Sequence, residues 1–127
     1  MNLFTRILTW PIVSLLITGG LHFMLEALRP DLQSLFVPAV LAPILLGYGA
    51  WVGYRAIQAG GTYVQAIVAG AILGLLPLIL DVVGFGMILA RGVDAGVTAG
   101  IFGLALVVFG SLLGSGVVLS RETAPAR

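Results

Sequence analysis

Long apolar stretches separated by short breaks make up almost the whole chain. An α-helix needs about 20 apolar residues to cross the hydrocarbon core of a membrane. Four stretches reach that length, at residues 7–28, 35–57, 63–90 and 95–120. The breaks between them carry helix-stop and turn residues, and such short connections place consecutive helices antiparallel. We therefore expect an all-α integral membrane protein with a single transmembrane domain over residues 1–127, an antiparallel four-transmembrane-helix bundle with short loops.

Composition narrows the possible functions. Hydrophobic residues make up 60% of the chain and charged residues 9%, whereas a soluble domain carries about 25% charged residues. The sequence has no cysteine and no lysine. It therefore offers no disulfide, no thiolate metal site, no cysteine nucleophile and no Schiff-base lysine. A net charge of +1 argues against nucleic acid as a partner. No catalytic motif is visible, so we expect neither an enzyme nor a bound cofactor.

The arginines predict how the bundle sits in the membrane. With a cytoplasmic N-terminus, the inner side carries four arginines, Arg6, Arg55, Arg121 and Arg127. The outer side then carries two, Arg29 and Arg91, a bias that follows the positive-inside rule. Arg6 before an apolar run resembles a signal peptide, but no small-residue cleavage pattern follows, so we expect a retained first helix. We expect both termini in the cytoplasm and the chain in the plasma (inner) membrane.

The 18 glycines are more than helices in water would carry. In a membrane, small residues let helix backbones approach closely, and this close packing drives association. Several fall four residues apart and on one face of the third or fourth helix. These candidate packing residues are Gly70, Gly74 and Gly84 on the third helix, and Gly96, Gly100, Gly103, Gly110 and Gly114 on the fourth. We expect these two helices to pack tightly on each other or on a neighbouring subunit.

Asp81 lies deep inside the third apolar stretch and on the same face as its glycines. A carboxylate near the middle of a bilayer costs a few kcal/mol, so it needs a partner, a proton or a function. Pro77 lies four residues before it. A proline there removes the helical donor to the Leu73 carbonyl and breaks or kinks the helix, either to expose an ion-binding carbonyl or only to shape the helix.

The first helix carries polar side chains every four residues, which stacks them along one face. They are Ser14, Thr18, His22 and Glu26. His22 and Asp81 fall at similar depths, so we expect them to approach each other and to offer a path for a proton or an ion, together with Glu26. The alternative is a packed interior face with satisfied polar groups. No metal site is expected, and ligation of a haem or pigment by His22 stays open.

The sequence GYGAWVGYRAIQAGGTYVQAIVAGAILGLL, residues 47–76, combines a small-residue helix ending in an arginine, a glycine turn and an AGxxxGLL start to the next helix. This pattern resembles families of small, glycine-rich bacterial membrane proteins with four predicted helices. Those families have no assigned activity. The resemblance implies the architecture and adds nothing about function.

Three classes of function remain open. The one we expect is a protein that acts by helix packing, as an accessory or scaffolding subunit of a membrane complex or as a self-associating homo-oligomer in the lipid bilayer. The second is an oligomeric proton- or cation-coupled transporter or channel that uses Asp81 with His22 and Glu26. The third is a protein that handles lipid or quinone, which needs an apolar pocket open sideways to the bilayer. The sequence gives no argument for or against the third.

Overall fold

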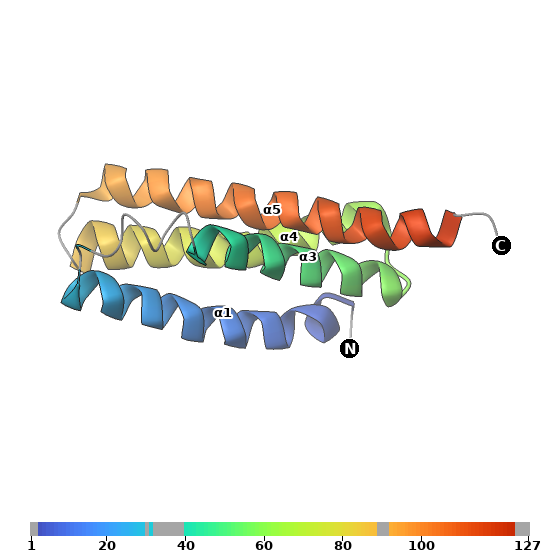
Figure 1. The fold of residues 1–127 in the computed structure, drawn as a ribbon, viewed down its shortest axis with the longest axis horizontal. Helices are drawn as coiled ribbons and strands as arrows, with labels where there is room; N and C mark the ends of the chain where they lie inside the picture. The colour runs from blue at the N-terminus through green and yellow to red at the C-terminus, as the bar shows by residue number, and fades with distance from the viewer. Residues whose placement is uncertain (1–2, 30, 32–39, 89–91, 124–127) are drawn as a thin grey trace.

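A computed structural model of the chain describes residues 3–29, 31, 40–88 and 92–123, apart from the side chains of Phe85 and residues 121–123. Over these residues the regular structure is helical (Figure 1). The elements are α1 (Leu3–Leu28), α3 (Ala42–Gln58), α4 (Tyr63–Leu80), the π-helix η3 (Asp81–Ile88) and α5 (Val93–Thr123). The prediction of a helical chain is thus confirmed for the described residues.

Three of the helical segments are long and apolar enough to cross a membrane, namely Leu3–Leu28, Tyr63–Ile88 and Val93–Ser120. The second predicted crossing, residues 35–57, matches only from α3 onwards, because residues 32–39 lie outside the described part. α3 itself has 17 residues, or about 26 Å at 1.5 Å per residue. The end of the third predicted crossing also lies outside, at residues 89–91.

The turn between α3 and α4 is formed by local interactions of residues that mark a turn in the sequence. Gly60 has a φ of 88°, a left-handed conformation that glycine adopts without steric cost. The Thr62 hydroxyl accepts from the Gln65 backbone N–H at 3.2 Å, and the Thr62 backbone N–H donates to the Gln65 side chain at 2.8 Å. This capping box satisfies two N–H groups at the start of α4 and fixes where the helix begins.

The helices alternate in direction, and α1 starts at the same end of the molecule as α5 finishes (Figure 1). α5 packs along both α3 and α4, and these three helices form the compact part of the bundle. Their contact surfaces carry small or branched apolar side chains that are fully buried, including Val52, Ala56, Ala69, Leu73 and Val107. α1 contacts only α3 and α4 extensively, so it lies at the edge of the bundle.

Glycines bring α3 and α5 together backbone to backbone. A Cβ atom on Gly49 or Gly53 of α3 would collide with the backbone of Val107 or Ser111 in α5. In return, a Cβ atom on Gly110 of α5 would collide with the Leu46 carbonyl oxygen in α3. Such close approach gains dispersion contacts along the whole interface, which is the main source of attraction between apolar helices in lipid.

The glycine face of α5 is divided between two neighbours. Gly96, Gly100 and Gly103 approach η3 or α4, where Gly100 would place a Cβ 2.8 Å from the Leu78 Cα. Gly110 and Gly114 approach α3 instead. Two neighbours share the glycine face because α5 lies between α3 and α4.

On α4, Gly70 lies against the Ser111 side chain and Gly74 against the Leu104 backbone, both in α5. Gly84, in η3, faces the Phe23 ring of α1, and a Cβ atom added to Gly84 would lie 3.1 Å from that ring. The described glycines on the predicted packing faces therefore meet other helices of the same chain.

One hydrogen bond joins α1 to α3. The Thr18 hydroxyl donates to the Ser14 carbonyl at 3.1 Å and lies 3.0 Å from the Tyr48 hydroxyl. Because Thr18 has a single proton, which it gives to Ser14, the Tyr48 hydroxyl is the donor in the second bond. This bond holds the middle of α1 against α3.

We expect Tyr48→Phe to lower the free energy of unfolding by about 0.6 kcal/mol, the average for a hydrogen bond between membrane helices. Reversible unfolding in mixed micelles, followed by circular dichroism, measures this. Tyr54→Phe is the matched control, because Tyr54 lies on the same helix and makes no side-chain hydrogen bond to a described residue. Equal losses in the two variants would contradict a specific role for the Tyr48 hydroxyl.

Arg29, just after α1, forms a two-point ion pair with Asp31, with both nitrogen–oxygen distances at 3.1 Å. The hydrogen bonds from Arg29 hold the pKa of the Asp31 carboxyl below its ordinary value. Both side chains are exposed, so the pair contributes little to stability. It marks the polar end of α1.

Candidate functional site

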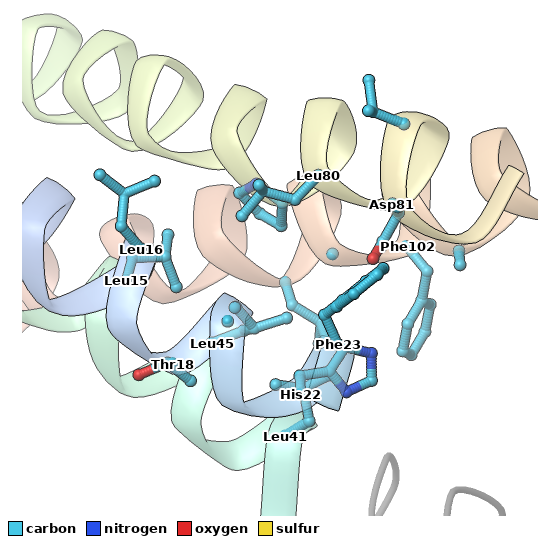
Figure 2. Close-up of a pocket in the computed structure, with 18 of the residues that line it drawn as sticks. Leu15, Leu16, Thr18, His22, Phe23, Leu41, Leu45, Leu80, Asp81 and Phe102 are labelled. Carbon is cyan, nitrogen blue, oxygen red and sulfur yellow. The ribbon is translucent and has the colours of Figure 1, made fainter. Parts of the chain in front are cut away.

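A cavity of about 420 Å³ lies between the C-terminal half of α1 and the rest of the bundle (Figure 2). All the described helices contribute to its lining. Leucines dominate the walls, among them Leu15 and Leu16 of α1, Leu45 of α3, Leu80 of α4 and Leu106 of α5. Ligand pockets that hold drug-sized molecules have volumes of about 300–1,000 Å³ and mostly apolar walls, so the cavity has the size and character of a binding site.

Three polar side chains line this apolar cavity within the described residues: Thr18, His22 and Asp81. Thr18 and His22 are four residues apart on α1, which places them on one helix face. Asp81 is the first residue of η3, on the opposite wall (Figure 2). The sequence had suggested that His22 and Asp81 approach each other, and the structure places both at the same cavity.

A change of helix type occurs at Asp81. The α-helix continues through Pro77 to Leu80, and the chain then winds as a π-helix over Asp81–Ile88. Pro77 lies inside α4, four residues before this change, and proline inside a membrane helix is tolerated through local 3₁₀ or π adjustments nearby. π-helical turns are rare and often occur at functional sites.

Helix α5 packs closely against the backbone of Asp81, whereas the side chain of Asp81 points away from α5. Gly96 of α5 would place a Cβ atom 2.7 Å from the Asp81 carbonyl oxygen, so α5 holds this side of η3 closely. The carboxyl group points the other way, towards Phe23 and His22 of α1 (Figure 2). It is half-buried, and no described residue forms a hydrogen bond or ion pair with it. A carboxyl group that is partly removed from water and has no partner is costly.

His22 and Glu26 form a second buried polar pair along α1. Both are only 7% exposed, and the Glu26 carboxylate acts electrostatically on the His22 imidazole. Glu26 is not among the residues that line the cavity. His22 therefore links the cavity to a carboxylate nearer the end of α1, in the order that the four-residue spacing predicts.

The cavity is open at the surface of the molecule. Some of its lining side chains are also exposed to the outside, including Leu16 at 46%, Val83 at 42% and Phe102 at 56%. They come from α1, η3 and α5 respectively. The mouth is thus rimmed by apolar side chains from three helices.

Sequence reasoning missed several members of the site. Phe23 and Phe102 looked like ordinary apolar residues, and Gly20 carried no packing signal, yet all three line the cavity.

Ser111 and Ser115 of α5 are fully buried and bond to backbone carbonyls of their own helix. Among the residues described, no group of three potential metal ligands comes together.

No protein-family model, curated protein or solved structure matches this chain. The resemblance of residues 47–76 to small bacterial membrane proteins therefore stays a prediction.

Proposed function

We propose that this protein is a non-enzymatic membrane transporter in which Asp81 carries a cation or a proton. A single observation supports this most strongly: an open cavity reaches a carboxyl group that has no partner among the described residues. A scaffolding protein gains nothing from such a group, because it costs stability and holds no helices together.

Membrane insertion as a four-span bundle is part of the proposal. Three long apolar helices support it. α3, together with the residues before it, would supply the fourth crossing. Since α1 begins and α5 ends on the same side (Figure 1), an even number of crossings follows, and the arginine bias assigns that side to the cytoplasm.

The glycine contacts weaken the case for a scaffold. Of the two predicted uses of these glycines, packing within the chain or against a neighbouring subunit, the contacts support the first, because the glycines on the packing faces of α3, α4 and α5 are directed at helices of the same chain. An accessory subunit or a self-associating bundle would then have to use other surfaces, such as the exposed face of α1. A homo-oligomer remains compatible with transport, since a second copy could extend the path beyond one cavity.

The proposed site exchanges a proton for a cation. The Asp81 carboxyl holds a proton when no cation is bound; a cation entering the cavity takes the place of that proton, which leaves through solvent or through His22. Charge in the cavity is then conserved in both states, which avoids a bare carboxylate in an apolar environment. An imidazole can both accept and release a proton, which suits a relay from His22 towards Glu26.

We expect Asp81→Asn to abolish cation-driven proton release from liposomes that contain the purified protein. The amide has the size of the carboxyl group but carries no titratable proton and no negative charge. A pH-sensitive dye trapped inside the liposomes measures the flux. Asp94→Asn is the matched control, because Asp94 lies at the exposed start of α5 and does not line the cavity.

The control should keep its flux at the wild-type level. Equal flux from the wild-type protein and Asp81→Asn would contradict the proposal. Liposomes without flux from either protein would also contradict transport and would favour the scaffolding function.

A further inference from the structure

We infer that the cargo is an amphipathic organic cation, a molecule with a spread positive charge and apolar substituents, and that it enters the cavity from the lipid. This inference rests on the proposed function and names its substrate class. It follows from the polar groups that the cavity offers, from its aromatic walls and from the position of its mouth.

The side chains that line the cavity offer too few oxygen ligands for a strongly hydrated inorganic cation to be the best fit. Ca²⁺ takes six to eight oxygen ligands, and Mg²⁺ demands a nearly ideal octahedron. The described lining offers one carboxyl group, that of Asp81, and the Thr18 hydroxyl, which already bonds Ser14 and Tyr48. One free carboxylate balances a positive charge but cannot replace a hydration shell.

The walls suit a cation that brings its own apolar surface. Two aromatic rings from different helices, Phe23 of α1 and Phe102 of α5, line the same cavity as Asp81 (Figure 2). Aromatic faces attract organic cations, and quaternary ammonium groups are recognised in this way. The leucine walls would bury the apolar part of the cargo at a gain of about 25 cal/mol per Å².

Charge in the cavity favours a cation over an anion. The titratable side chains among the described lining residues are His22 from α1 and Asp81 from η3, and α3, α4 and α5 contribute none. His22 is accompanied by the Glu26 carboxylate. The two carboxyl groups and the single imidazole therefore offer a bound anion no net positive charge, whereas the Asp81 carboxylate can balance a bound cation.

The mouth lies at the depth of the acyl chains. Leu16 is about 18 Å along the helix from the end of α1 at Leu28, and Phe102 is about 14 Å from the start of α5 at Val93. Both positions fall well within a hydrocarbon core of about 30 Å. An amphipathic cation already dissolved in the membrane reaches this mouth without crossing water.

The test uses two probes of the same shape and opposite charge, tetraphenylphosphonium and tetraphenylborate. Equilibrium dialysis against the protein in lipid nanodiscs, with empty nanodiscs subtracted, gives the affinity for each. We expect saturable binding of tetraphenylphosphonium, about 30-fold or more weaker in Asp81→Asn because one member of a buried charge pair is lost. Tetraphenylborate should show no binding above that of empty nanodiscs.

A second pair of variants tests the cavity without touching its charge. Gly20 lines the cavity, and a Cβ atom there would meet nothing within 4 Å. Gly20→Leu should therefore fold and fill the mouth, lowering the affinity for tetraphenylphosphonium at least about tenfold. Gly47→Leu is the control: Gly47 is also exposed and unobstructed, on α3, but does not line the cavity.

The outcomes separate this inference from the proposed function. Asp81-dependent proton flux without Asp81-dependent binding of tetraphenylphosphonium would overturn the inference and leave transport standing. Binding that Asp81→Asn and Gly20→Leu both weaken, without any flux, would support the binding site and overturn transport. Equal binding of the two probes, or equal loss in Gly20→Leu and Gly47→Leu, would overturn the inference.

Discussion

Gly114→Ala is expected to lower the free energy of unfolding by about 2–3 kcal/mol. The added methyl group would collide with the Ala50 carbonyl oxygen and lie 2.7 Å from the Ala50 Cα, both backbone atoms of α3. A backbone cannot rotate aside as a flexible side chain can, so α3 and α5 must separate along their interface. Overpacking of this kind costs about 1–3 kcal/mol. Unfolding in mixed micelles measures the loss.

The same helix provides the control for this prediction. A Cβ atom on Gly116 would meet nothing within 4 Å, and alanine is the better helix former. Gly116→Ala should therefore leave the stability unchanged or raise it slightly. If the two variants lose equal stability, any glycine-to-alanine substitution in α5 has this effect. The close contact that we describe between α3 and α5 would then be contradicted.

Asp81→Leu is expected to stabilise the protein by about 2–3 kcal/mol while removing transport. An aspartate at the centre of a membrane helix costs about 2.5–3.5 kcal/mol on insertion scales, and no described residue offsets that cost at Asp81 with a hydrogen bond or an ion pair. Leucine also adds apolar contacts to the cavity wall. A gain in stability with a loss of activity is typical of a functional site. Thermal unfolding and the liposome assay give the two readings.

A structural role for Asp81 predicts the opposite sign. Removing one member of a buried, satisfied polar pair costs about 3–5 kcal/mol. A large loss of stability in Asp81→Leu would therefore show that the carboxyl group holds the bundle together. Asp94→Leu, at an exposed site on α5, controls for the general effect of adding a leucine.

The described helices and the turn between α3 and α4 were predictable from the sequence because local signals determine them. The apolar lengths gave the helices, and Gly60 with Thr62 marked the turn before α4. The partners of the glycines were not predictable in the same way. Spacing places Gly100 and Gly110 on one face of a helix, but whether that face meets one neighbour or two depends on the arrangement of the whole bundle.

The candidate site was partly predictable. The cost of a charge in an apolar stretch identified Asp81, and the four-residue spacing identified Thr18 and His22. The sequence carries no signal for the cavity, because the cavity depends on how α1 packs against the other helices. The π-helix at Asp81 was also missed, since Pro77 appeared to be the place where the helix would break.

Infrared difference spectroscopy tests the central claim most directly, because it observes the Asp81 carboxyl group itself. The protein in nanodiscs is measured before and after tetraphenylphosphonium is added. We predict the loss of the C=O band of a protonated carboxylic acid and the gain of carboxylate bands, both absent in Asp81→Asn. A spectrum in which the acid band does not change, or changes equally in Asp81→Asn, would contradict the exchange of a proton for a cation at Asp81.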